Sequence, residues 1–208
     1  PDYAEGYNNR GNIFFMLENL NDALKSYEQA IKLKPGFADA YNNRGNALRK
    51  LNKKNDAIES YQKATKLNPN YAVAYKNLGS VLREVSDIDN AIQSYQKAIE
   101  INPNYSEAFL DLGNIYRENG NNTIALKNYE RTLKLKPNFD FLLGTISHVK
   151  LKICKWDTIE KNLIEIESMI EGQASIEISK IESNLAYLAT ISGAAPMIGF
   201  LGTVIGMI

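Results

Sequence analysis

The sequence is poor in the residues from which most catalytic and metal sites are built. Among its 208 residues it has one cysteine, Cys154, and one histidine, His148. A lone cysteine forms no internal disulfide, and these two residues fall short of the ligand set of a structural zinc site. They lie six positions apart, on roughly opposite sides of a helix, so a Cys–His nucleophile pair is not expected. We therefore predict no catalytic residues, no metal ligands and no cofactor.

The chain also lacks an excess of charge of either sign. Its 24 lysines and arginines balance its 24 aspartates and glutamates. Proteins that bind nucleic acids use surplus positive charge to attract the phosphate backbone. We therefore expect no nucleic-acid partner. The N-terminus shows no signal peptide, and because Pro1 lies within the pattern described next, we expect the chain to be a fragment.

What the sequence does contain is a repeat of 34 residues. Five columns of residues return at this step, four times each, and chance does not place five columns in register. The columns are Pro35, Pro69, Pro103 and Pro137; Gly11, Gly45, Gly79 and Gly113; Ala23, Ala57, Ala91 and Ala125; Tyr27, Tyr61, Tyr95 and Tyr129; and Tyr7, Tyr41, Tyr75 and Phe109. The repeat is the main organising feature of the chain.

Each repeat predicts two helices that pack against each other. In the second repeat, apolar residues at helical spacing run from Tyr41 to Leu51 and again from Ala57 to Leu67, and polar residues separate the two runs. Gly45 and Ala57 are small where two helix backbones must approach closely, and Pro69 ends the second helix. One such pair cannot bury its apolar face alone, so stacked pairs are expected to form a superhelix.

These columns resemble the tetratricopeptide repeat family over residues 1 to 136. The resemblance implies an all-α fold: four two-helix repeats in residues 1–136, then a degenerate capping repeat in residues 137–172, and an apolar helix in residues 173–208. It also implies a scaffold that binds another protein or peptide rather than an enzyme.

In this family the first helix of each repeat lines the concave face, so its polar columns are the candidate peptide-binding groove. Because their spacing of three puts both columns on one helix face, stacked repeats would display a ladder of amides. An amide both donates and accepts, and can therefore bind the backbone of an extended peptide of any sequence. The alternative is that these are merely solvated polar residues. The columns are Asn9, Asn43, Asn77 and Asp111, and Asn12, Asn46, Ser80 and Asn114.

The ladder resembles the one in the repeats of O-linked N-acetylglucosamine transferases, from which Asp111 departs. It differs from the lysine-rich clamps that grip the acidic C-termini of chaperones. The corresponding positions hold Glu5, Asp39, Val73 and Glu107, which would repel a terminal carboxylate. An adaptor for chaperone tails is therefore disfavoured.

Residues 137–172 keep a helical period but lose the glycine and alanine columns. Cys154-Lys155-Trp156-Asp157 resembles the segment that joins repeats to the catalytic domain in bacterial relatives of the same transferases. The simpler interpretation is that Cys154 and Trp156 pack in a core and that His148 lies at the surface.

The last 26 residues, from Ser183 to Ile208, carry no charge. Residues 185–208 are long enough to cross a membrane, and Gly202 and Gly206 form a small-xxx-small pattern that favours helix–helix association. Residues 174–208 resemble the second membrane helix of the ExbB/TolQ/MotA proton-channel family, in which Thr203 would face the pore. The alternative is a terminal helix packed on the repeats.

The sequence thus favours an interaction scaffold that holds extended polypeptide in an Asn-lined groove. Two alternatives stay open: the substrate-recognition arm of a transferase of the O-GlcNAc type, and part of an ExbB-type transport subunit. The repeats are expected to be cytoplasmic and anchored at the bacterial inner membrane.

The uncharged tail generates a first prediction. We expect residues 1–172 to be soluble and monomeric, whereas the full chain should need detergent or associate, because burial of apolar surface is favourable by about 25 cal/mol per Å². Sedimentation of both chains without detergent measures this. A monodisperse, detergent-free monomer of the full chain would exclude the membrane interpretation.

Overall fold

The computed structural model describes residues 3–139, 142–153, 168 and 171, and no strand occurs among them. The chain divides into two compact units, Pro1–Leu142 and Leu143–Ile208, each described here by itself. The helices are α1 (Tyr3–Met16), α2 (Leu20–Leu33), α3 (Ala38–Lys50), α4 (Lys54–Leu67), α5 (Ala72–Glu84), α6 (Ile88–Ile101), α7 (Ser106–Glu118), α8 (Asn122–Leu135) and α9 (Leu142–Lys152).

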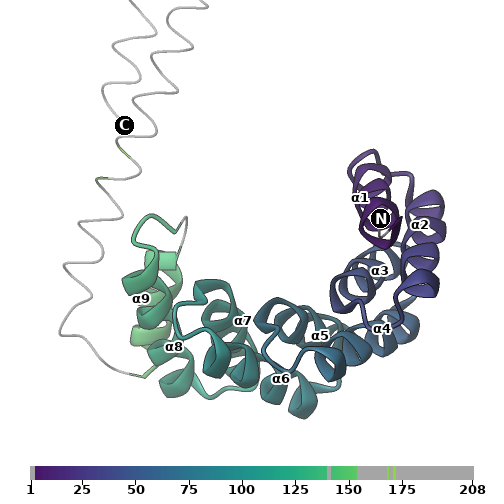
Figure 1. Cartoon of the computed structure of the whole chain (residues 1–208). Helices are drawn as coiled ribbons and strands as arrows, with labels where there is room; N and C mark the ends of the chain where they lie inside the picture. Colours follow the sequence, from purple (N-terminus) through teal and green to yellow (C-terminus); the bar gives the residue numbers. More distant parts are fainter. Residues whose placement is uncertain (1–2, 140–141, 154–167, 169–170, 172–208) are drawn as a thin grey trace, which may run out of the picture. The chain divides into compact units, whose positions relative to one another are not determined.

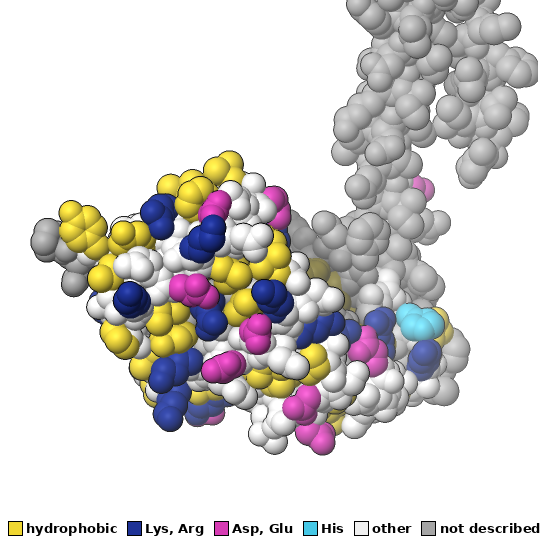
Figure 2. Space-filling model, turned by 90° about the vertical axis from the view of Figure 1, so that its right-hand side faces the viewer, with side chains coloured by type: hydrophobic (Ala, Val, Ile, Leu, Met, Phe, Trp, Pro, Cys, Tyr) yellow, Lys and Arg dark blue, Asp and Glu magenta, His cyan; other side chains and the backbone are white. Residues whose placement is uncertain are grey.

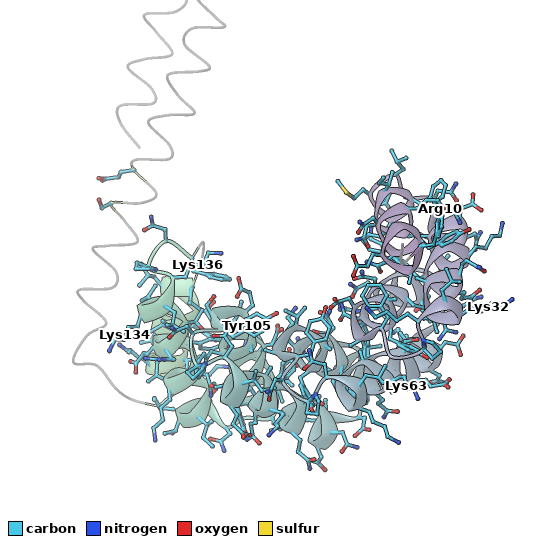
Figure 3. All side chains as sticks on the ribbon, in the orientation of Figure 1. Arg10, Lys32, Lys63, Tyr105, Lys134 and Lys136 are labelled. Carbon is cyan, nitrogen blue, oxygen red and sulfur yellow. The ribbon has the colours of Figure 1, made fainter. Side chains whose placement is uncertain are left out.

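The helices α1 to α8 form four pairs, and each pair is one predicted repeat. Helices α2, α4 and α6 also contact the first helix of the next repeat, so the four pairs stack one after another. In this unit the ribbon follows an arc with α1, α3, α5 and α7 on its inner side (Figure 1). The labelled side chains of Lys32 and Lys63, on second helices, project from the outer side (Figure 3). The predicted all-α repeat fold is therefore confirmed, and its first helices form an inner face.

Within each repeat, a tyrosine of the second helix packs over a glycine of the first. Tyr61 is fully buried, and a Cβ placed on Gly45 would lie 2.6 Å from its Cε1 atom. The same approach is 2.5 Å for Gly11 against Tyr27. Glycine is unfavourable within a helix, so its place here is explained by the space that the aromatic ring occupies.

The repeats share one continuous apolar core. Ala23, Ala57 and Ala91 are fully buried between helices, and the buried cluster to which they belong runs from α2 through to Ile115 in α7. Since each repeat contributes the same small and aromatic residues, the core continues without interruption along the stack. The surface outside it has mixed charge: Figure 2 shows lysine and arginine side chains interspersed with aspartate and glutamate.

The turn inside each repeat has a residue with a left-handed backbone at the same position. These residues are Glu18 (φ 59°), Asn52 (φ 59°), Ser86 (φ 64°) and Gly120 (φ 76°). In the third repeat the amide of Ser86 bonds the carbonyl of Arg83, and that of Asp87 bonds the carbonyl of Leu82. This pattern satisfies the last carbonyls of the helix. Three of the four turns therefore hold a side chain in a conformation that favours glycine.

Helix α9 lies where the sequence predicts a further helix after Pro137. Leu142, Ile146 and Val149 are buried on it, and His148 is exposed as expected. No helix in the described part of the chain is both long and apolar enough to span a bilayer. The predictions for Cys154, Trp156, Gly202, Thr203 and Gly206, and for the apolar helix of residues 173–208, lie outside the described residues.

The glycine–tyrosine contact generates a second prediction. Gly45→Ala should lower the free energy of unfolding by about 1–2 kcal/mol, because overpacking against the buried Tyr61 ring outweighs the better helix propensity of alanine. Gly6, also within a helix, has no atom within 4 Å of its Cβ position and is the matched control. Gly6→Ala should leave stability unchanged or raise it by up to about 1 kcal/mol. Urea denaturation of both variants measures the difference, and equal effects would contradict the close contact.

The left-handed turns generate a third prediction. Ser86→Gly should stabilise the chain by about 0.5–1 kcal/mol, because glycine adopts positive φ without steric cost, and the reciprocal change Gly120→Ser should destabilise it by a similar amount. Both positions are exposed, so burial does not contribute. Thermal denaturation measures the two shifts, and shifts of the same sign would show that backbone conformation does not decide stability here.

Candidate inner-face binding site

The second predicted column connects the two helices of each repeat. In the second repeat the buried hydroxyl of Tyr61 donates to Oδ1 of Asn46 at 2.7 Å. The other three repeats have the same bond: Tyr27 to Asn12 at 2.9 Å, Tyr95 to Oγ of Ser80 at 3.1 Å, and Tyr129 to Asn114 at 2.9 Å. The column therefore satisfies the one polar atom of each buried tyrosine, a role that the sequence did not predict.

Burial also determines the protonation of these tyrosines. Desolvation raises the pKa of Tyr27 to about 12 and raises the pKa of Tyr61 and Tyr95 further. A hydroxyl whose pKa is higher in the folded state contributes stability that is fully present below the ordinary tyrosine pKa of about 10 and is lost as the pH rises through the folded value. At neutral pH all of them are donors.

The first predicted column connects neighbouring repeats. Nδ2 of Asn43 donates to Oδ1 of Asn8 and to Oδ1 of Asn12, both at 3.1 Å. One repeat further on, Nδ2 of Asn77 donates to Oδ1 of Asn42 at 3.0 Å and to Oδ1 of Asn46 at 3.3 Å. The amides thus form a hydrogen-bonded network across the first helices rather than a row of independent side chains.

The network includes a column that sequence reasoning missed. Asn8 and Asn42 are buried, and Lys76 stands at the same step of 34 residues in the third repeat. The doublets Asn8-Asn9 and Asn42-Asn43 were the available signal. A residue one position before the predicted column points toward the following repeat, which the period within one repeat does not reveal.

Some groups of the ladder remain unused by the protein. In residues 3–139, Nδ2 of Asn12 and of Asn46 donates to no protein atom, and Oδ1 of Asn77 accepts from none. Asn9 is exposed and, within the same residues, makes no side-chain hydrogen bond. These donors and acceptors lie on successive first helices, so they are the part of the ladder open to a ligand.

The acidic column lies in the first turns of the same helices. Glu5 and Asp39 are exposed, and Glu107 accepts from the hydroxyl of Ser106 at 2.8 Å. Hydrogen bonds with its own backbone and with this hydroxyl lower the pKa of Glu107 below its usual value, so it is ionised at neutral pH. This column keeps the negative charge that argues against a carboxylate ligand at this end of the helices.

Asp111 interrupts the amide ladder, and the structure gives the reason. Its carboxylate faces the ammonium of Lys76, with 3.7 Å between Oδ2 and Nζ. Asp111 and Lys76 occupy the positions that Asn77 and Asn42 occupy one repeat earlier. An ion pair thus replaces the amide pair at the junction of the third and fourth repeats.

A hollow of about 370 Å³ adjoins this ion pair and is lined by Arg49, Lys76, Ser80, Arg83, Glu84, Tyr95 and Asp111. Ion pairs between repeats border it. The Arg49 guanidinium bonds Glu84 Oε1, with Nε at 2.7 Å, and that of Arg83 bonds Glu118 Oε1 at 2.5 Å. The hollow is therefore polar, and its arginines already have carboxylate partners.

A second hollow, of about 670 Å³, has a different character. It is lined by apolar side chains of α4 and α5, among them Ile58, Tyr75 and Leu78, and by polar side chains of α6 that include Gln93 and Asn90. It contains none of the predicted ladder residues. It is the competing candidate for a peptide site.

Comparison with known families supports the repeats. Models described as tetratricopeptide repeat match residues 38–71, 60–93 and 106–139, and one described as TPR repeat matches residues 11–51 and 79–120. A model described as the MotA/TolQ/ExbB proton channel family matches residues 140–208. This match begins before residue 174, where the sequence resemblance started, and most of it lies outside the described residues. No curated protein matches the chain.

Solved structures share the fold. A crystal structure of MamA is 27% identical, has a TM-score of 0.71, and covers 79% of this chain and 96% of its own. MamA 41-end from Desulfovibrio magneticus RS-1 is 17% identical, with a TM-score of 0.72 over 83% of this chain and 98% of its own. YrrB, described as a TPR protein with an unusual peptide-binding site, is 22% identical and has a TM-score of 0.63. The match covers 76% of this chain and 81% of YrrB. The last two show the fold alone. The stacked helix pairs and the family matches together show that residues 11–139 form an array of tetratricopeptide repeats.

Proposed function

We propose that this chain is a protein-interaction scaffold that holds extended polypeptide on its inner face, mainly through hydrogen bonds to the peptide backbone. The observation that supports this most directly is the set of unused amide groups on successive first helices: Nδ2 of Asn12 and Asn46, Oδ1 of Asn77, and both ends of Asn9. An extended peptide presents N–H and C=O groups at regular intervals along its length, whatever its side chains are. Asn43, Ser80, Asp111 and Asn114 complete the proposed site.

The internal bonds of the ladder favour this function. Asn46 is held through its Oδ1 by Tyr61 and Asn77, which fixes the orientation of its free Nδ2. Side chains that are ordered before binding lose little conformational entropy when a ligand arrives. The network therefore serves binding by orienting the groups that remain free.

A second candidate function is favoured by the match to the proton channel family over residues 140–208. In this proposal the repeats are the cytoplasmic part of a transport subunit at the bacterial inner membrane. Residues 185–208 would enter the bilayer, Thr203 would face the pore, and Gly202 and Gly206 would contact a neighbouring helix. The alternative of a glycosyltransferase arm rests only on the sequence resemblance.

The ladder generates a fourth prediction. The double variant Asn12→Asp, Asn46→Asp keeps the Oδ1 acceptors that hold Tyr27 and Tyr61 but removes both free Nδ2 donors. Losing two hydrogen bonds of about 0.5–1.5 kcal/mol each should weaken binding by about 5- to 150-fold for peptides of unrelated sequence alike. Fluorescence polarisation with labelled, terminally blocked peptides of glycine and serine, with and without alanine or threonine, measures the affinity.

Two control variants distinguish peptide binding by the free amides from a purely stabilising role and from binding in the second hollow. Tyr27→Phe with Tyr61→Phe removes the two internal bonds that the Asp variant keeps, and Asn43 and Asn77 still hold the Oδ1 atoms of Asn12 and Asn46. Stability should therefore fall while binding stays within about threefold of the unmodified chain. Asn90→Ala with Gln93→Ala alters the second hollow and should leave binding unchanged. Loss of binding in the latter variant, with the Asp variant unaffected, would move the site to that hollow.

A further inference from the structure

The junction of the third and fourth repeats differs from the two before it. In those junctions an Asn Nδ2 donates to two oxygens of the preceding repeat, so donor and acceptors are satisfied together. Here Asp111 has no hydrogen to donate, and Lys76 has no lone pair to accept one. The polar groups at this position are therefore a cation and an anion that form an ion pair.

Lys76 and Asp111 are close, but the protein does not bridge them. Their 3.7 Å separation exceeds hydrogen-bond distance, and each side chain is about a quarter exposed, at 24% and 22%. Ser80 does not connect them, because its hydroxyl donates to the backbone carbonyl of Lys76 at 3.0 Å and accepts from Tyr95. Burial raises the pKa of Asp111, and the positive charges of Lys76, Arg83 and Arg49 oppose that rise without cancelling it.

The surrounding charges are already paired. Arg49 bonds Glu84, and Arg83 bonds Glu118. Within residues 3–139, Lys76 and Asp111 are thus the charged side chains of the hollow that make no hydrogen bond to an oppositely charged group, and they lie side by side on the inner face. We infer that this hollow, defined by Lys76 and Asp111, is a specificity subsite for the side-chain amide of an asparagine or glutamine in the bound polypeptide.

A primary amide has the chemistry that this pair needs. Its carbonyl oxygen accepts from the Lys76 ammonium while its NH₂ group donates to the Asp111 carboxylate. Hydrogen bonds to charged groups are stronger than those between neutral groups. An acidic side chain can pair with Lys76 but is repelled by Asp111, whereas a basic one can pair with Asp111 but is repelled by Lys76, so a charged guest satisfies one member of the pair and the amide satisfies both.

This inference rests on the proposed function, and the experiment separates the two. The probes are terminally blocked nonapeptides of glycine and serine with one central guest residue: Ala, Gln, Glu or Lys. With the full chain, kept in detergent if it requires it, the Gln peptide should bind about tenfold more tightly than the Ala peptide. The Glu and Lys peptides should bind no more tightly than Ala.

Removing one charge of the pair at a time should shift the peptide preference in opposite directions. Asp111→Asn leaves Lys76 and should shift the preference to the Glu peptide, whereas Lys76→Asn leaves Asp111 and should shift it to the Lys peptide. The double variant recreates the amide pair of Asn42 and Asn77 and should bind all four peptides within about threefold of one another. Each variant introduces an asparagine that the array already accommodates at the same column, and circular dichroism checks its helicity.

The possible results test the subsite and the proposed function separately. Opposite shifts in the two single variants support the subsite. Equal affinity of the unmodified chain for all four guests, or a Gln preference that survives the double variant, overturns the subsite and leaves backbone binding standing. Binding of no peptide at all overturns the proposed function, and the subsite with it.

Discussion

The structure depends on one contact, the packing of a buried tyrosine over a helical glycine. The ring of Tyr61 fills the space that a side chain at Gly45 would need, and this fixes how closely the two helices of the repeat approach. The same ring ends in a hydroxyl that cannot be left unsatisfied in the core. The contact that sets the helix spacing therefore also requires a polar partner on the first helix.

That requirement explains the second ladder column. Asn46 accepts the hydrogen bond of Tyr61, and Ser80 accepts that of Tyr95. An amide, however, has two ends, and the tyrosine uses only the oxygen. The Nδ2 of Asn46 is left on the inner face as a consequence of how the core is satisfied. Stability and the capacity to bind are thus provided by opposite ends of one side chain.

Much of this could be predicted from the sequence, since the columns of proline, glycine, alanine and tyrosine define the helix pairs and their order. The family matches agree with that assignment. The roles of the asparagines could not be predicted in the same way. Asn8 and Asn43 meet only because neighbouring first helices lie side by side, and a period within one repeat contains no information on that distance. The positive φ of Glu18 and Ser86 could not be predicted either, because the turn imposes it and neither residue type prefers it.

The ion pair at the fourth repeat shows how a repetitive array acquires a distinct position. A uniform amide ladder binds an extended chain equally well in every register, because a backbone contact is the same at each step. Replacing Asn by Lys76 and Asn by Asp111 changes both members of one pair, so neither charge is left alone at the junction. A single substitution would leave a partly buried charge without a partner, which is costly. The coupled change therefore adds a position that distinguishes side chains, while the packing of the two helices within the fourth repeat, which depends on Gly113 and Tyr129, stays as it is elsewhere in the array.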